Sequence, residues 1–162
     1  MKRRRLEFKT DYRARMQILT SGKPRIVFRK TNRYLIGQYV VSKAAQDSIL
    51  SQACSRELFG LGWPKNFAGS LKSLPAAYLT GLLLGKRVVE KYGKQKLILD
   101  LGLLRNKAKS RIYAFVKGVI DAGIELSLDK KILPDEARIK GSHMKKDIQS
   151  LLNTVAKNIE NG

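Results

Sequence analysis

The sequence predicts an α/β protein: a mixed sheet with an antiparallel three-strand meander and helices on its faces. Alternating apolar side chains at 25–30 and 33–42, followed by a third run at 48–54, indicate consecutive strands that pair as a meander. A later apolar strand at 96–102 lies between helical patterns and therefore needs crossover connections. Because the chain has 162 residues and 43% of them are hydrophobic, it can bury one substantial core.

The chain begins with a basic arm, residues 1–9, and a helix is expected directly after it. Thr10 is a suitable N-cap because its hydroxyl can accept a hydrogen bond from the first turn. Tyr12, Met16 and Leu19 recur on one side of that helix. These residues, together with the glycine and proline that end the helix, make up an N-terminal part at 1–24.

The hairpin formed by the first two strands is expected to close at Thr31-Asn32, a weaker turn signal than Asn-Gly. Residues 60–74 are predicted to be loop. Pro75 then begins a helix that Gly93 ends, since proline suits the first helical turn and glycine the C-terminus.

The remaining elements follow the apolar spacing. Ser110 is predicted to cap a helix that ends at Gly123, and a short strand follows. Residues 127–141 are irregular. The last helix is expected at 142–162, and its apolar residues form one stripe: Met144, Ile148, Leu151, Leu152, Val155 and Ile159. This stripe is expected to cover the sheet, with a partner helix as the alternative.

Positive charge is the strongest compositional signal. The chain has 33 Lys and Arg against 13 Asp and Glu, a formal net charge of +20. Residues 1–33 hold twelve cations and two acids, and residues 86–117 hold ten and two, whereas 34–85 are nearly neutral. Because charge at this density repels itself, an anionic polymer is the expected partner.

The hairpin turn combines cations with hydrogen-bonding groups. Arg29, Lys30 and Arg33 can bind phosphates, and Thr31 and Asn32 can bond to bases or 2′-hydroxyls. Three aromatic side chains near the arm and turn offer stacking faces: Phe8, Tyr12 and Tyr34. A solvated edge that resists aggregation is the alternative, but the number of cations in this segment favours RNA.

The segment LLRNKAKSR, residues 103–111, predicts a second anion-binding site. It joins a buried strand to a helix N-terminus, where backbone N–H groups favour anions. Its cations are Arg105, Lys107, Lys109 and Arg111. A nucleotide-binding loop is disfavoured because neither GxxxxGK[ST] nor GxGxxG occurs.

No cofactor, metal site or small-molecule substrate is expected. His143 is the only histidine and Cys54 the only cysteine, too few for a zinc site, and neither a disulfide nor a catalytic triad is indicated. Asp100 is the single hint of a nuclease, which needs several carboxylates. No apolar run approaches the ~18 residues of a membrane span, so we expect a soluble cytoplasmic protein.

Seven segments resemble the archaeal type of large-subunit ribosomal protein eighteen, whose eukaryotic counterpart is ribosomal protein five. The matching segments are RRR…KTDYRAR (3–15), SGKPRIVFRKTNRYLIGQ (21–38), SRELFGLGW (55–63), PAAYLTGLLLGKR (75–87), LILDLGL (97–103), KGVIDAG (117–123) and PDEARIKGSHM (134–144). They occur in order and cover most of the chain.

The resemblance implies a ribonuclease H-like sheet without that enzyme's carboxylates, in a ribosome-bound protein. It implies 5S rRNA contacts from the basic N-terminal segment and from the first strands around the Arg29–Arg33 turn, within an RNA-binding core at 25–141. It also implies docking into the central protuberance beside 23S rRNA and neighbouring ribosomal proteins. The RNA-facing positions that it carries over are Arg3, Arg4, Arg5, Lys9, Thr10, Asp11, Tyr12, Arg13, Arg15, Lys23, Arg25, Arg29, Lys30, Thr31, Asn32, Arg33, Tyr34 and Gln38.

Two other functions remain open from the sequence. Charge alone is also typical of a free-standing nucleic-acid chaperone or DNA-binding protein. An enzyme built on the ribonuclease H-like sheet would use Asp100.

Overall fold

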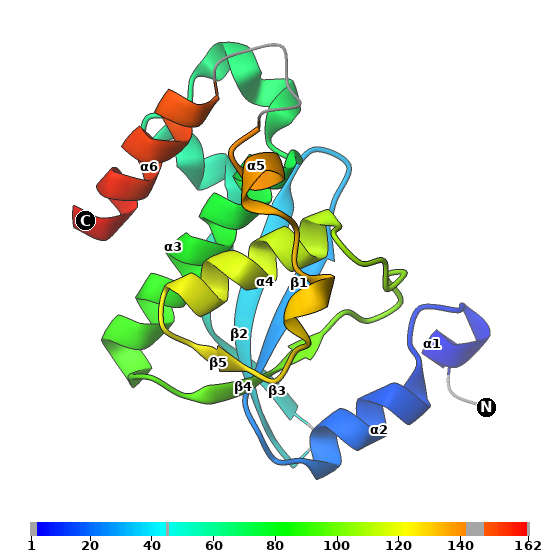
Figure 1. The fold of residues 1–162 in the computed structure, drawn as a ribbon. Coiled ribbons are helices and arrows are strands. Elements are labelled where there is room, and N and C mark those ends of the chain that lie inside the picture. The colour runs from blue at the N-terminus through cyan, green and yellow to red at the C-terminus, as the bar shows by residue number, and fades with distance from the viewer. Residues whose placement is uncertain (1–2, 45, 142–147, 162) are drawn as a thin grey trace.

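The computed structural model describes residues 3–44, 46–141 and 148–161 (Figure 1). Its elements in chain order are α1 (Arg3–Leu6), α2 (Tyr12–Thr20), β1 (Arg25–Lys30), β2 (Leu35–Lys43), β3 (Gln46–Cys54), the 3-10 helices η1 (Ser55–Phe59) and η2 (Lys65–Ser70), α3 (Leu74–Tyr92), β4 (Lys96–Asp100), α4 (Arg111–Asp121), β5 (Glu125–Leu126), the 3-10 helix η3 (Lys130–Ile132), α5 (Glu136–Ile139) and α6 (Gln149–Asn161).

The five strands form one mixed sheet in the order β3-β2-β1-β4-β5. β1, β2 and β3 pair antiparallel, so the predicted meander is confirmed. β4 pairs parallel with β1 on one side and with β5 on the other. The parallel pairs are reached through α3 and α4, as crossover connections require. This arrangement confirms the predicted fold class and is consistent with a ribonuclease H-like sheet.

One face of the sheet is covered by α3 and α4, which lie in front of the strands in Figure 1. Ile26 and Phe28 of β1 are buried on this face, and the Phe28 ring lies 5.0 Å from the Phe115 ring of α4. Alternation along β1 directs Arg25, Val27 and Arg29 to the opposite face. The sheet therefore separates an apolar layer from a face that carries arginines.

The C-terminal helix α6 packs mainly against α3, so its apolar stripe does not cover the sheet directly as predicted. Among the described members of the stripe, Leu151 is half-buried. Ile148, Leu152, Val155 and Ile159 are buried. Lys86 of α3 holds the helix end, because its Nζ donates to the carbonyls of Ile159, at 2.7 Å, and Glu160. The predicted start of this helix, with Met144, lies in 142–147, outside the described residues.

The N-cap of α2 is Asp11, so the prediction of Thr10 is wrong. The Asp11 carboxylate accepts hydrogen bonds from the backbone N–H groups of Arg13 (2.9 Å) and Ala14 (3.2 Å). A carboxylate also interacts favourably with the positive end of the helix dipole. Met16 is 58% exposed, so the predicted apolar side of α2 is not a core face.

The β1–β2 hairpin closes through four residues, 31–34, instead of a turn centred on Thr31-Asn32. The backbone N–H of Thr31 donates to the Tyr34 carbonyl at 2.9 Å. The Thr31 hydroxyl accepts from the Tyr34 N–H and donates to the Tyr34 carbonyl, both at 2.9 Å. These three bonds stabilise the wider turn.

The segments predicted as irregular contain single helical turns. η2 lies within 60–74, and η3 and α5 lie within 127–141. Elements this short contain too few residues for a helical period to be visible in the sequence. Across the described ranges, no helix combines the length and the apolar composition that crossing a membrane requires.

Candidate nucleic-acid interface

A groove of about 550 Å³ lies between the N-terminal segment and the arginine-bearing face of the sheet; we call it the arm groove. Its lining residues are Arg4, Lys9, Thr10, Asp11, Ala14, Arg15, Ile18, Leu19, Arg25, Arg29 and Leu99 to Leu104. Five of them are cations. The arm, α2, β1 and the segment after β4 thus meet at one basic hollow.

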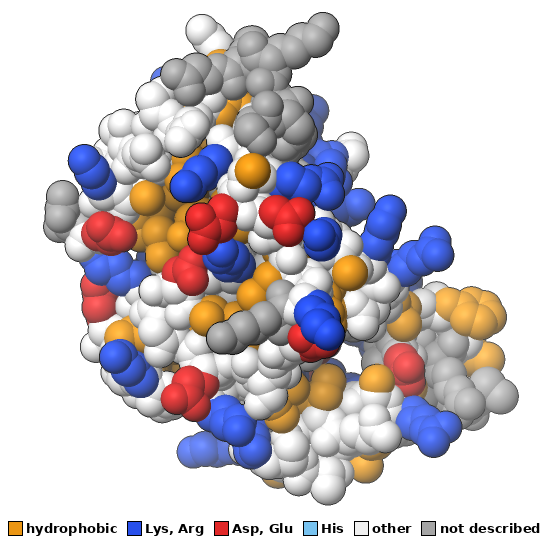
Figure 2. All heavy atoms as spheres, viewed as in Figure 1, with side chains coloured by type: hydrophobic (Ala, Val, Ile, Leu, Met, Phe, Trp, Pro, Cys, Tyr) orange, Lys and Arg blue, Asp and Glu red, His pale blue; other side chains and the backbone are white. Residues whose placement is uncertain are grey.

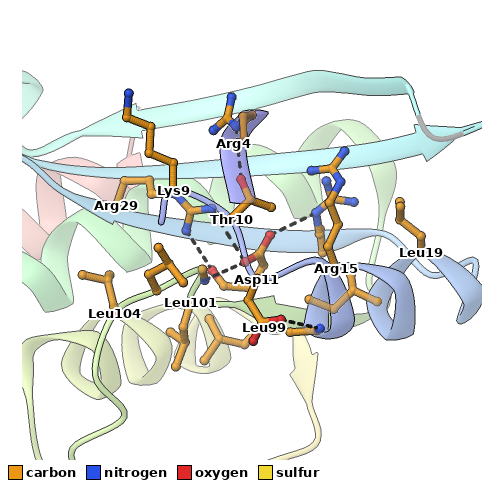
Figure 3. A pocket seen from close by; sticks show the side chains of 16 residues that line it. Arg4, Lys9, Thr10, Asp11, Arg15, Leu19, Arg29, Leu99, Leu101 and Leu104 are labelled. Atoms are coloured by element: carbon orange, nitrogen blue, oxygen red, sulfur yellow. Dashed lines mark hydrogen bonds and ion pairs between the residues drawn. The ribbon is translucent and has the colours of Figure 1, made fainter. Parts of the chain in front are cut away.

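Within the arm groove, Arg15 and Arg29 lie on opposite sides, and Leu99, Leu101 and Leu104 lie along one wall (Figure 3). Local contacts hold some of the cations in place. The Nε of Arg4 donates to the Thr10 hydroxyl at 3.1 Å, and Lys9 pairs with Glu7 at 2.9 Å. The groove therefore offers charged groups above an apolar wall, which suits a polyanion with flat bases.

Arg25 lies inside the protein rather than on its surface, although the resemblance placed it toward RNA. Its side chain is only 4% exposed. It pairs with Asp47 at 2.8 Å, lies 3.4 Å from Asp100, and donates to the Ser42 hydroxyl at 2.6 Å. A buried guanidinium needs such partners to offset its lost hydration.

Asp47 remains charged under all ordinary conditions. Desolvation by burial is the largest single effect and acts to raise the pKa of its carboxyl. Hydrogen bonds from Ser42, Arg25 and Arg15, with the charge of Arg25, act in the other direction and together lower the pKa to about 2. The sequence offered no signal that identified Asp47.

A second hollow, of about 610 Å³, surrounds the N-terminus of α4; we call it the loop pocket. Its lining residues are Phe28, Lys30, Ser73, Leu74, Leu104, Arg105, Lys107, Ala108, Lys109, Ser110, Arg111, Ile112 and Arg138. Six are cations and none is an acid. The four cations predicted from the sequence are therefore brought together, and Arg138, which sequence reasoning missed, joins them from α5.

Figure 2 shows Lys and Arg side chains gathered at the upper right of the face, over the β1–β2 turn and the loop before α4. Lys109 pairs with Asp135 at 3.1 Å. Arg105, Lys107 and Arg111 have no ion pair within the part of the chain that the structure describes. Ser110 occupies the N-cap position of α4, but its buried hydroxyl makes no hydrogen bond to another described residue, so the predicted side-chain cap is not formed.

Arg29 and Lys30 are adjacent in β1 but line different hollows. Arg29 lines the arm groove and Lys30 the loop pocket. Successive side chains of a strand point to opposite faces of the sheet, which explains the separation. Arg29 and Lys30 therefore serve two separate hollows, and Arg33 lines neither of them.

At the turn itself, Thr31 and Tyr34 determine the backbone shape through their hydrogen bonds, and Asn32 and Arg33 point their side chains into solvent. Tyr34 is partly buried and packs against the core. Asn32 and Arg33 are exposed, and neither side chain has a hydrogen bond or ion pair to a described residue. Their polar groups are therefore available for another molecule.

The other predicted positions lie outside the two hollows. Arg3, Arg13 and Lys23 are exposed on the N-terminal part, and Tyr12 is half-buried at the start of α2. Gln38 donates from its amide to Gln52 at 3.3 Å. The side chain of Arg5 is outside the described part.

Metal-dependent chemistry finds no support in the described residues, where no three His, Cys, Asp or Glu side chains lie close enough to share a metal ion. Asp100, the single hint of a nuclease, pairs with Arg25 and with Arg29, at 3.4 and 3.7 Å. Its carboxylate is thus neutralised by arginines.

Comparison with known proteins shows the family of this basic protein. Residues 1–98 match the family described as ribosomal large subunit proteins 60S L5 and 50S L18. The chain belongs to this family. It is therefore a structural ribosomal protein and not an enzyme, with ribosomal RNA and ribosomal proteins as partners and the cytoplasmic ribosome as its location.

Individual relatives extend the match to most of the chain. Large ribosomal subunit protein uL18 of Korarchaeum cryptofilum is 49% identical over 142 residues, covering 88% of this chain and 70% of the relative. The protein of the same name in Methanoculleus marisnigri is also 49% identical, covering 88% and 78%. That of Halobacterium salinarum is 40% identical over 149 residues, covering 92% and 79%. These relatives confirm the predicted archaeal type.

Proposed function

We propose that this protein binds 5S rRNA through the arm groove and the β1–β2 turn, and helps to dock it onto 23S rRNA through the loop pocket. Family membership supports ribosomal RNA as the partner. The observation that carries the finer assignment is the division of adjacent cations, Arg29 and Lys30, between two hollows. One small domain can thereby contact two RNA segments.

Each hollow offers what an RNA backbone needs. Exposed Arg and Lys side chains bind phosphates with little regard to sequence. Asn32 and Arg33, unpaired among the described residues at the tip of the turn, supply the groups for specific contacts. Phe8 is 87% exposed next to Lys9 and offers a face for stacking on an unpaired base.

The test of 5S rRNA binding is a titration of the purified protein with a 5S transcript and with an unrelated RNA of equal length, at several salt concentrations. If about six phosphates are neutralised, log affinity falls with log salt at a slope of about −4 to −5. Arg33→Gln is expected to weaken 5S binding. Arg56→Gln, which removes an exposed cation that lines neither hollow, is the matched control. Equal affinity for both RNAs contradicts the proposal and favours a general chaperone.

The two-hollow assignment has its own test. Arg4→Gln in the arm groove is expected to weaken binding of the 5S transcript, and Arg111→Gln in the loop pocket to weaken binding of 23S rRNA fragments. Crosslinking from each hollow, followed by sequencing of the attached RNA, identifies the segment directly. If both variants weaken the same RNA equally, the proposed division between the hollows is wrong, while rRNA binding stands.

A further inference from the structure

The arm groove is built around a buried cation. Arg25 Nη2 contacts Asp47 Oδ2 at 2.8 Å, and Arg25 Nε lies 3.4 Å from Asp100 Oδ2. The Ser42 hydroxyl accepts from Arg25 at 2.6 Å and donates to Asp47 at the same distance. Arg25 therefore forms ion pairs with two carboxylates, one on β3 and one at the end of β4.

Each of those carboxylates also forms an ion pair with an arginine at the groove. Arg15 of α2 donates to Asp47 at 3.0 Å. Arg29 lies 3.7 Å from Asp100 and donates to the backbone carbonyls of Phe28 (2.9 Å) and Asp100 (3.4 Å). The side chains of Arg15 and Arg29 are 38% and 44% exposed, so both remain accessible.

These five residues form one alternating row, Arg15–Asp47–Arg25–Asp100–Arg29, which we call the arginine–aspartate chain. It connects α2, β3, β1 and β4. A second bond secures Asp100, since its Oδ1 accepts from the Gly102 N–H at 2.8 Å. The chain carries three positive and two negative charges, and its two ends lie on opposite sides of the arm groove (Figure 3).

We propose that Asp47, Arg25 and Asp100 are positioning residues, which hold Arg15 and Arg29 in the geometry that binds two phosphates of one RNA backbone. This inference rests on the proposed function. Free arginine side chains lose rotamer freedom when they bind, and an arginine that is already held loses less. The acids therefore strengthen RNA binding although they repel phosphate.

Whether Asp100→Asn weakens or tightens RNA binding distinguishes a positioning role of the carboxylate from a simple effect of its negative charge. Asp100→Asn raises the net charge by one and keeps an oxygen for the Gly102 N–H. Glu125→Gln makes the same charge change on an exposed residue of β5 outside both hollows. With a 5S transcript as the probe, we expect Asp100→Asn to weaken binding by about 3- to 10-fold and Glu125→Gln to leave it unchanged or slightly tighter. If both variants tighten binding, the proposal is overturned.

A double-mutant cycle excludes a merely structural effect. In the Arg29→Gln background, Asp100→Asn is expected to lose its effect on RNA binding, because the side chain through which it acts is gone. Urea unfolding of each variant shows whether the fold is retained, and Asp47→Asn with Arg15→Gln repeats the cycle at the other end. Additive effects at both ends overturn the positioning role. Failure of the wild type to prefer the 5S transcript would instead reject the proposed function.

Discussion

Gly81 of α3 and Gly118 of α4 occupy reciprocal positions at the crossing of their helices. A Cβ at Gly81 would lie 2.0 Å from the Phe115 carbonyl oxygen, and a Cβ at Gly118 would lie 2.1 Å from the Tyr78 carbonyl oxygen. Each glycine therefore contacts the backbone one turn before the other glycine. No side chain fits at either position without moving a helix that supports the sheet.

Gly118→Ala is expected to lower the free energy of unfolding by about 1–3 kcal/mol, because overpacking against backbone outweighs the better helix propensity of alanine. Urea denaturation at neutral pH measures the change. Gly60→Ala is the control, since a Cβ there lies 3.5 Å from the nearest atom and its φ is −69°. A Gly118→Ala variant as stable as the wild type contradicts the close approach of α3 and α4.

Asp11 is expected to support RNA binding as a helix cap rather than as a contact. Asp11→Ala removes the acceptor for the N–H groups of Arg13 and Ala14, with a loss of about 0.5–2 kcal/mol in the stability of α2. Asp11→Ser removes the same charge but keeps a capping oxygen. Protection of the α2 amides against exchange and affinity for 5S rRNA should both fall in the alanine variant and be retained in the serine variant. If the serine variant keeps its amide protection but loses as much 5S affinity as the alanine variant, the carboxylate itself touches RNA.

Thr31 is expected to act through the shape of the turn. Thr31→Val keeps the size of the side chain but removes both hydroxyl bonds to the Tyr34 backbone, at a loss of about 1 kcal/mol in stability. Because the turn presents Asn32 and Arg33, 5S selectivity should fall with it. Thr31→Ser retains the hydroxyl and should behave as the wild type. Titrations of both variants with 5S rRNA and with unrelated RNA measure this selectivity. An unchanged selectivity in Thr31→Val contradicts a role for the Thr31 hydroxyl in shaping the turn for RNA binding.

Asp47 makes stability depend on acidity. Its pKa is about 2 in the folded protein and 3.8 ordinarily, so its contribution is fully present above the ordinary value and is lost as pH falls through about 2. At pH 7 Asp47→Asn should lower the free energy of unfolding by about 1–2 kcal/mol, after allowance for its partial exposure. Urea titrations from pH 7 to 2 should show this difference shrinking. A difference that stays constant with pH assigns the effect to packing.

The order and type of the main elements could be predicted because their signals are local. Apolar alternation located β1 and the meander, and Pro75 and Gly93 delimited α3 to within one residue. The twofold alternation of β1 also determines that the side chains of Arg29 and Lys30 point to opposite faces of the sheet. Which hollow each one lines depends on segments far along the chain.

The organisation of the arm groove could not be predicted, because it also depends on contacts between segments that are far apart in the sequence. Asp47 is the second residue of β3, and the sequence around it is that of an ordinary exposed acid. Its partners come from α2 and β1. Arg25 looks like its basic neighbours in the sequence, and only the position of β1 at the centre of the sheet buries it. Arg138 lies in a four-residue helix, too short for a periodic signal.

The pairing of β1 with β4 also determines when the arm groove exists during synthesis. The meander joins neighbouring segments and can form early, as local contacts do. The bond between Arg29 and Asp100 spans 71 residues, so it waits until α3 has been made and β4 has entered the sheet. A nascent chain that has emerged only as far as β3 presents its basic arm without a finished groove. We therefore expect selective recognition of RNA to require completion of the core, and shorter nascent chains to show only loose, salt-sensitive association.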